Sequence, residues 1–447
     1  MNTHKIFTIA GTIFLLALTL SSCTSNSNWP QFRGPENNMI AMAESLPLEW
    51  GEDLNIRWSI EVEGDSWSSP IVWGKKVFLA SSVPVKVAAA PERREGAPQE
   101  GEDESFKSEV YRWEVSCMDL ESGELLWKQV AFEGSPRIKK HRANNYAAET
   151  PVTDGKRLYV YFGMTGLYCY NLDGSLLWEK DLGAYKTLYD WGTGSSPVVY
   201  KETLYIQVDN EENSFLVALD AATGDEIWKA DRDEKTNYST PMIWQNSVRT
   251  ELVVGGKTAR SYDPETGELL WELVVPGHYN IPGPVADNDF LYLGNAPWRD
   301  TPGTFFSVKA GAEGNITPAE GETSSSGVAW AILDAPLGSP SPLLHNGLIY
   351  LVSSRGGTVT CIDAASGEQV YQEKIEGVGA CWASPWVYED QVYFSDEKGV
   401  SRIFKAGKNF ELLGENKLDD KFWASVAITG DAYLMKGTEK LYCIGQQ

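Results

Sequence analysis

One phrase recurs along this chain: a polar turn that ends in Gly, followed four residues later by a large aromatic residue. It reads DLESGELLW at 119–127, NLDGSLLW at 171–178, DAATGDEIW at 220–228, DPETGELLW at 263–271 and DAASGEQVY at 363–371. Such recurrence is the signature of a repeat protein, in which each unit buries its apolar surface against the next. The repeat therefore constrains the fold more than any other feature of the sequence.

A second phrase opens each unit and places small or hydroxylated residues before Pro and a short apolar run. It stands at 68–72, 149–152, 195–199, 239–242, 282–285, 341–344, 384–387 and, without its Pro, at 425–428. A polar turn and a β-rich run follow each copy. Short strands with Gly, Asn and Asp turns at a period of roughly 40–50 residues predict four-stranded antiparallel blades. We therefore expect an all-β, eight-bladed β-propeller over residues 54–447.

The aromatic residue of the first phrase opens the fourth strand of its blade, where it is placed to pack against the neighbouring blade. Gly is expected before it because a tight hairpin often needs a positive φ. Each buried indole contributes roughly 2–3 kcal/mol through its apolar area. The predicted docking residues are Trp58, Trp127, Trp178, Trp228, Trp271 and Tyr371. Trp330 takes this role in the fifth unit, and the seventh unit lacks an aromatic residue at 411–413.

The ring must close, yet the last unit ends soon after its third strand at 443–445. Residues 55–62 carry the pattern of a fourth strand, with Trp58 at the position that Trp127 holds in its own blade. We predict that this N-terminal strand pairs with the eighth blade, because closure removes exposed strand edges that invite aggregation.

Two insertions interrupt the repeat. Residues 83–109 are rich in Ala, Pro, Glu and Gly, which predicts a disordered insertion, with a partner-binding loop as the alternative. Residues 310–326 are similarly rich in Gly, Glu and Ser. Four cysteines occupy one repeat position, so we expect small buried hydrophobes there, with a disulfide or a metal ligand less favoured. They are Cys117, Cys169, Cys361 and Cys443.

The first 22 residues stand outside the repeat. Lys5 precedes an apolar run at 6–20 that is too short for a good membrane span and is typical of a secretory signal. The run ends in Leu20-Ser21-Ser22-Cys23 and resembles a bacterial lipoprotein signal. By that resemblance Cys23 is lipidated, the outer membrane is favoured, and residues 23–53 form a lipid-anchored tether and N-terminal extension. An ordinary cleaved signal is the alternative.

The charge of the chain excludes one class of partner. A net charge of -24 and a pI near 4.6 leave no basic surface for nucleic acid, whose affinity depends on phosphate contacts. Attraction to anionic lipid headgroups is disfavoured for the same reason, so membrane contact is expected through the lipid anchor only.

Loops that enter the first strands converge at one end of the ring axis and carry polar and aromatic residues. Such a funnel is suited to a peptide, a sugar or a small planar ligand, although the same side chains can simply plug the channel and cap strands. The candidate funnel residues are Trp67, Asn145, Tyr146, Trp191, Tyr238, His278, Asn280, Trp382 and Trp423.

The docking phrase resembles the tryptophan-docking motif of the pyrroloquinoline-quinone-like propellers, over about residues 54–445. The opening stretch 28–35, NWPQFRGP, is similar to the start of many exported propellers of that family. Some members are quinoprotein alcohol or glucose dehydrogenases. Another is the BamB-type lipoprotein subunit of the outer-membrane β-barrel assembly machinery.

The dehydrogenase members imply a quinone on the axis beneath a disulfide of adjacent cysteines, a Ca²⁺ ion and an Asp base. This chain has no adjacent cysteine pair, and its histidines outside the signal, at 141, 278 and 345, show no metal-ligand spacing. We therefore expect no enzyme activity, no cofactor and no metal, and instead a binding or scaffold propeller with protein partners in the cell envelope. Outer-membrane protein assembly is the most concrete role. A quinone-dependent dehydrogenase and a carbohydrate-binding or sensor propeller are the alternatives.

Overall fold

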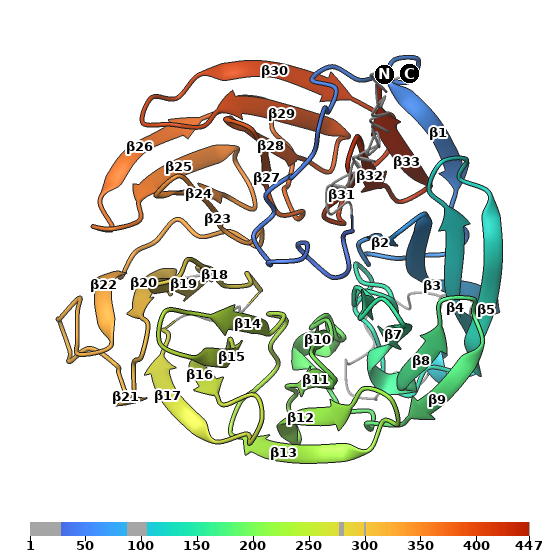
Figure 1. Cartoon of the computed structure of the whole chain (residues 1–447), viewed down its shortest axis with the longest axis horizontal. Helices are drawn as coiled ribbons and strands as arrows, with labels where there is room; N and C mark the ends of the chain where they lie inside the picture. Colours follow the sequence, from blue (N-terminus) through green and yellow to red (C-terminus); the bar gives the residue numbers. More distant parts are fainter. Residues whose placement is uncertain (1–27, 87–104, 277–280, 299–300, 447) are drawn as a thin grey trace, which may run out of the picture.

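The computed structural model describes residues 28–86, 105–276, 281–298 and 301–446. Eight antiparallel sheets are arranged around a central axis, each with its first strand innermost (Figure 1). This confirms the predicted all-β, eight-bladed propeller. Within the described residues, no helix has the length and apolar character needed to cross a membrane.

The first four blades follow one another along the chain. Blade 1 contains β2 (Ile71–Trp73), β3 (Lys76–Lys86), β4 (Val110–Asp119) and β5 (Leu125–Gly134). Blade 2 contains β6 (Val152–Thr153), β7 (Arg157–Tyr161), β8 (Leu167–Asn171) and β9 (Leu176–Lys180). Blade 3 contains β10 (Val198–Tyr200), β11 (Thr203–Val208), β12 (Ser214–Asp220) and β13 (Glu226–Arg232). Blade 4 contains β14 (Met242–Gln245), β15 (Thr250–Val254), β16 (Thr258–Tyr262) and β17 (Leu269–Val274), with β21 (Gly314–Asn315) added at its edge.

The other four blades complete the ring. Blade 5 contains β18 (Val285–Ala286), β19 (Phe290–Asn295), β20 (Thr304–Lys309) and β22 (Val328–Ile332). Blade 6 contains β23 (Leu343–His345), β24 (Leu348–Val352), β25 (Thr358–Asp363) and β26 (Gln369–Lys374). Blade 7 contains β27 (Trp386–Tyr388), β28 (Gln391–Ser395), β29 (Val400–Lys405) and β30 (Leu412–Lys417). Blade 8 contains β31 (Ala427–Ile428), β32 (Ala432–Lys436), β33 (Lys440–Gly445) and β1 (Ile56–Glu61). Short 3-10 helices are η1 (Ser105–Ser108), η2 (Gly163–Thr165) and η3 (Leu188–Asp190).

The docking motif works through close approach of an indole to a glycine. In the turn of blade 4, the Asp263 carboxylate accepts hydrogen bonds from the backbone N–H groups of Glu265 and Thr266. Gly267 follows with φ +74°, and a Cβ there would lie 2.7 Å from the Trp228 ring of blade 3. A Cβ is therefore excluded by both the backbone and the neighbouring blade.

Four docking tryptophans also donate their indole N–H to a backbone carbonyl of the next blade. The donor–acceptor pairs are Trp58 to Leu120 (2.9 Å), Trp127 to Leu172 (3.1 Å), Trp228 to Pro264 (3.1 Å) and Trp330 to Ala364 (3.0 Å). Trp178 packs over Gly224 of blade 3 without a protein partner for its N–H. Tyr371 packs edge-on against Phe410 of blade 7, with ring centroids 5.7 Å apart.

Small residues on the third strands make room for these rings. Cys117, Cys169 and Ala218 lie directly across from the docking tryptophans of blades 1, 2 and 3 in the strand register. Cys117, Cys169, Cys361 and Cys443 are free and buried, as their shared repeat position predicts, and Cys381, which lies outside that position, is also free and buried.

Trp271 packs in one hydrophobic cluster with residues of blade 5, but it differs from the other docking tryptophans in the partner of its indole N–H. Its side chain is fully buried, and its N–H donates to the Glu251 carboxylate of its own blade at 2.7 Å. The cause is β21, which comes from the insertion at 310–326 and pairs in parallel with β17, placing Gly314 opposite Trp271. The insertion of blade 5 thus covers the outer edge of blade 4.

The N-terminal strand closes the ring as predicted. β1 pairs antiparallel with β33, and Trp58 lies opposite Cys443. The predicted disordered insertion at 83–109 is narrower than expected, because residues up to Lys86 continue β3 and η1 occupies 105–108. Residues 87–104 lie outside the described residues.

Residues 28–53, the described part of the predicted tether and N-terminal extension, pack into the ring. Trp29 exchanges two backbone hydrogen bonds of 2.8 Å with Val72 of the innermost strand of blade 1. In the innermost strand of blade 7, the Val387 N–H donates a hydrogen bond to Met39 O, and the Val387 carbonyl accepts one from Ala41 N. In Figure 1 the extension crosses the centre of the ring and then runs outward between blades 7 and 8 to reach β1.

The extension also supplies an aromatic residue that blade 7 lacks. Gly414 pairs with Ile403 and therefore stands where other blades carry their docking tryptophan. Buried Trp50 lies beside this blade, with its ring 6.3 Å from Tyr393 of β28 and 5.5 Å from Tyr433 of β32. Trp50 thus joins blades 7 and 8, a contact that the sequence pattern did not predict.

Candidate binding face and axial channel

The ring has two unlike faces. We call the side with the segments that lead into the first strands, and with the links between second and third strands, the loop face. The opposite side, with the Asp-x-x-x-Gly turns and the turns between first and second strands, is the turn face. The described funnel candidates lie in segments of the loop face, whereas His278 and Asn280 lie outside the described residues.

Three funnel tryptophans form a stacked column on the loop face. The Trp67 and Trp423 rings lie 4.5 Å apart at 10°, and those of Trp423 and Trp382 lie 4.9 Å apart at 11°. They come from blades 1, 8 and 7, each three positions before the Pro site of its first strand, so the repeat itself aligns them. All three are half-buried. This Trp column is therefore partly accessible to solvent on the loop face.

A second aromatic group lies on the loop face between blades 2 and 3. Trp191 stacks on His141 with ring centroids 4.0 Å apart. Next to it, Tyr189 is 62 % exposed, and Tyr189 and Asp190 both have positive φ, at 52° and 59°. Left-handed backbone conformations are uncommon for residues other than glycine and cost conformational energy, and such strain is concentrated at functional sites. Sequence reasoning missed Tyr189, because only the backbone conformation marks it.

Two other funnel candidates serve the structure of the ring. Asn145 is buried, and its side-chain oxygen accepts a hydrogen bond from Ala147 N at 2.8 Å. Tyr146 is buried against Tyr111 and Trp113, and this burial raises the pKa of its hydroxyl. Tyr238 is half-buried beside Gly194. The prediction that Asn145 and Tyr146 line an open funnel is therefore wrong.

Arg33 occupies the axial channel. Its Nη1 donates to Pro284 O at 2.7 Å and its Nη2 to Pro342 O at 2.9 Å, and the residue is 1 % exposed. These carbonyls belong to blades 5 and 6, whereas Trp29 and Pro30 bond to blades 1 and 2. Arg33 therefore reaches across the axis, and its burial lowers the pKa of the guanidinium to about 9.

The residues on the axis do not fit a quinone with its Ca²⁺ ion. Residues 29–41 hydrogen-bond along the innermost strands of several blades, and the Arg33 side chain crosses the axis between them. Cys381 stands alone, and its burial raises the pKa of the thiol to about 12. The described part of the chain contains no group of three or more His, Cys, Asp or Glu residues placed to hold a metal.

A buried polar cluster lies between blades 2, 3 and 4 near the loop face. Arg232 and Asp209, both with fully buried side chains, pair at 2.9 Å, and Asn237 donates to the same carboxylate at 3.2 Å. The adjoining cavity, of about 20 Å³, is lined by the Gln207 amide, which has no hydrogen-bond partner among the described residues. This volume suits roughly one water molecule and excludes a larger ligand.

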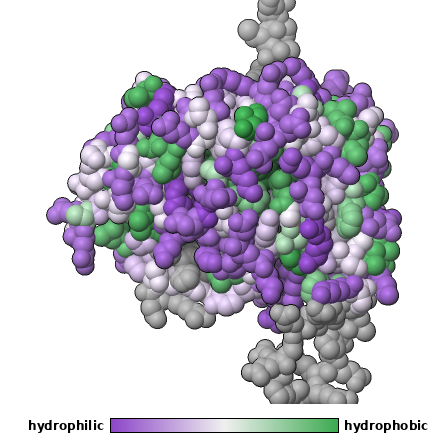
Figure 2. Space-filling view, turned by 90° about the horizontal axis from the view of Figure 1, so that it is seen from below, coloured by the Kyte–Doolittle hydropathy of each residue, from purple (hydrophilic) through white to green (hydrophobic). Residues whose placement is uncertain are grey.

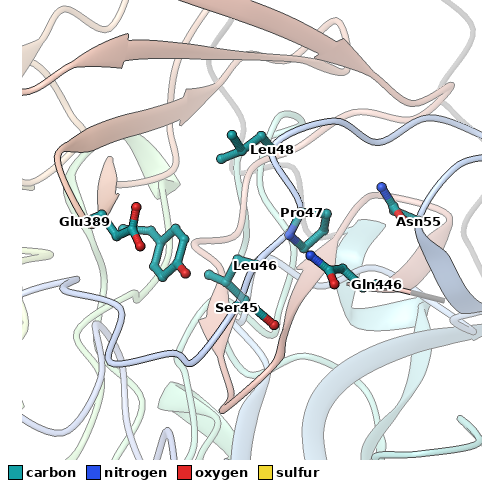
Figure 3. A pocket seen from close by; sticks show the side chains of 8 residues that line it. Ser45, Leu46, Pro47, Leu48, Asn55, Glu389 and Gln446 are labelled. Carbon is teal, nitrogen blue, oxygen red and sulfur yellow. The ribbon is translucent and has the colours of Figure 1, made fainter.

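The turn face contains an open groove beside the extension (Figure 3). Its volume is about 610 Å³. Leu46, Pro47 and Leu48 form one side of it, and Tyr388 and Glu389 from the turn after β27 form another. Seen edge-on, the ring has a mainly hydrophilic surface with separate hydrophobic patches (Figure 2).

Comparisons with known proteins agree with this architecture. A family model described as outer membrane protein assembly factor BamB matches residues 112–280 and 294–408. The crystal structure of BamB from Moraxella catarrhalis is similar with a TM-score of 0.57 and 12% identity, covering 87% of this chain and 96% of that one. Quinohemoprotein alcohol dehydrogenase from Comamonas testosteroni is similar with a TM-score of 0.62 and 12% identity, covering 96% and 82%.

No curated protein sequence matches this chain. At 12% identity the similar structures establish the propeller fold alone, and they include both a BamB and a dehydrogenase. The family model, in contrast, spans more than half of the chain. The chain therefore belongs to the family of the outer membrane protein assembly factor BamB.

Proposed function

We propose that this chain is a non-catalytic, protein-binding propeller lipoprotein of the cell envelope that serves in outer-membrane protein assembly. Membership of the BamB family supports the assembly role. The partners are protein subunits of the β-barrel assembly machinery, and the membrane is reached through lipid on Cys23.

The observation that carries the non-catalytic part is the filled axis. A quinone in this fold needs an open place on the axis, and here Arg33 spans that place between the carbonyls of Pro284 and Pro342. Displacing the segment that carries Arg33 from the axis would also break the backbone hydrogen bonds between Trp29 and Val72. A segment that fills the axis in this way suits a binding protein, because its contacts connect opposite blades and make the ring rigid.

The loop face supplies the contact surface. Tryptophan and tyrosine contribute much of the binding energy at protein interfaces, and both the stacked Trp column and the exposed Tyr189 lie on this face. The turn face is less suited, because acidic side chains such as Asp263, Glu265 and Glu268 recur in its turns.

The path of the extension orients these faces. Asn28 accepts a hydrogen bond from Gly74 N in the turn between β2 and β3, so the described chain enters the ring on the turn face. A lipid on Cys23 would therefore hold the turn face toward the bilayer and leave the loop face pointing away from it.

Site-specific photo-crosslinking in cells tests the contact surface. Tyr189 on the loop face and Val248 in a turn of the turn face are both 62 % exposed, which makes them a matched pair. With a photoreactive residue at position 189, we expect adducts with barrel-assembly subunits in envelope fractions, and few or none from position 248. Equal yields of these adducts from both positions, or none from either, would contradict the proposal.

A separate assay tests the absence of catalysis. The purified protein is given the quinone and Ca²⁺, and dye reduction is followed with alcohols and sugars as substrates. We expect no turnover above the rate of a heat-denatured control. Reproducible turnover would overturn the non-catalytic assignment.

A further inference from the structure

Arg33 is a buried cation that meets no carboxylate among the described residues. Its two hydrogen bonds go to neutral carbonyls, and its Nε–H has no hydrogen-bond partner in the described part of the chain. The pKa of this guanidinium is lowered by burial alone, without opposing attraction from a carboxylate. At a pKa of about 9 the group still carries its charge at neutral pH.

The other buried arginines of the described chain have carboxylate partners, which Arg33 lacks among the described residues. Arg232 pairs with Asp209, Arg260 pairs with Asp233 and Glu234, and Arg402 pairs with Asp396 and Glu415. Each of these guanidinium groups meets at least one carboxylate. Arg33 is buried at least as deeply, at 1 % exposure, and meets none among the described residues.

An unpaired charge in the protein interior is costly. Moving an isolated ion out of water costs several kcal/mol even after the protein relaxes, and arginine cannot relieve this cost by losing its proton. Two carbonyl oxygens compensate only part of that cost. An anion brought in from solution would compensate the rest.

We infer that the axial channel is an anion-binding site, in which a small monovalent anion, chloride or a carboxylate such as formate, binds the guanidinium of Arg33. The Gly283 backbone lies beside the guanidinium, since a Cβ added there would lie 3.3 Å from Nη1. A monovalent anion matches the single positive charge of Arg33. The inference is independent of the partner that the loop face binds.

Bromide locates the site directly. Crystals of the mature protein grown in a chloride-free medium are soaked in sodium bromide, and anomalous scattering is measured. We expect a bromide peak within hydrogen-bonding distance of the Arg33 guanidinium. A map with bromide only at surface lysines, or with water alone at Arg33, would overturn the inference, and this holds whether or not any variant folds.

Thermal unfolding gives a second measurement in solution. Sodium chloride or formate replaces sodium gluconate at constant ionic strength, and the midpoint is expected to rise and then level off, as it does when a ligand binds only the native state. Arg33→Met should lose this rise. Arg142→Met, which removes an exposed arginine from the loop face, should keep it.

The net charge of -24 makes non-specific anion attraction a weak explanation for such a response. An equal response in Arg33→Met and the wild type would assign the effect to the bulk salt and contradict an axial site. Chloride and formate are compared at the same concentrations. The anion whose unfolding midpoint levels off at the lower concentration is the one that binds more tightly.

Discussion

A left-handed glycine and the indole that covers it form the residue-scale unit of this ring. The same pair recurs as Gly123 with Trp58, Gly174 with Trp127, Gly224 with Trp178, Gly267 with Trp228 and Gly367 with Trp330. Each pair joins two blades, so one small residue and one large residue determine the packing of a whole sheet on its neighbour.

This unit predicts the effect of a single methyl group. Gly267→Ala should lower the free energy of unfolding by about 1–2 kcal/mol through the left-handed backbone, and by more through displacement of the Trp228 ring. Gly414→Ala is the matched control, because Gly414 has no positive φ and open space around its added Cβ. Urea unfolding of both variants measures the difference, and an equal loss at the two positions would argue against the docking pair.

Glu149 predicts a pH dependence. Burial raises the pKa of its carboxyl to about 7, whereas an unfolded glutamate titrates near 4.3. Between these values the native state retains a proton that the unfolded chain has lost, so this residue makes the protein less stable as pH rises. Glu149→Gln removes the effect, so its stability relative to the wild type should increase from about pH 4 to 7, by roughly 3 kcal/mol in total.

Urea unfolding at a series of pH values gives this comparison. Glu320→Gln, which changes an exposed side chain, serves as the control for the substitution itself. A constant difference between Glu149→Gln and the wild type across the range would mean that the Glu149 carboxyl has the same pKa in the folded and unfolded states.

At the scale of elements, the sequence predicted what repeats and missed what occurs once. The eight blades, the closing strand β1 and the substitute Trp330 all follow from a pattern that can be compared between units. The contacts of Arg33 and Trp50 have no counterpart in other units, because each depends on residues more than 200 positions away in the chain. Gly414 revealed the gap in blade 7, but nothing local indicated which residue fills it.

The extension therefore carries a prediction of its own. Trp50→Ala should lower the free energy of unfolding by about 3–5 kcal/mol, because it leaves a cavity beside Tyr393 and Tyr433. Leu48→Ala lies in the same segment but changes a side chain that is 46% exposed, and its effect should stay within roughly 0.5 kcal/mol. Chemical denaturation distinguishes the two, and a Trp50→Ala variant as stable as Leu48→Ala would mean that the extension only rests on the ring.

At the scale of the whole molecule, the two faces differ in chemistry and in their relation to the lipid anchor that we propose at Cys23. Acidic turns surround the side where Asn28 enters, and aromatic loops occupy the other side. The aromatic face was predicted from the repeat, although two of its expected residues proved to be buried. The side on which the chain enters could not be predicted, because the path of residues 28–53 has no signal in the repeat.

The orientation of the anchored protein can be measured on vesicles. Fluorescent labels are placed at Glu265→Cys on the turn face or at Arg142→Cys on the loop face, both exposed, and the lipoprotein is reconstituted with a quencher on the lipid headgroups. We expect stronger quenching at position 265. Stronger quenching at position 142 would reverse the proposed orientation. The native cysteines of the described chain are buried and should not react.

The route of the extension also determines how the molecule bears mechanical load. A force applied to the chain at Asn28 acts first on the backbone hydrogen bonds between Trp29 and Val72. It acts next on the hydrogen bonds of Arg33 to blades 5 and 6, and then on the backbone hydrogen bonds of the extension to Val387. Only beyond these does tension reach the seam where β1 meets β33. The axial contacts of the extension therefore bear the force before it reaches the strand pairing that closes the ring.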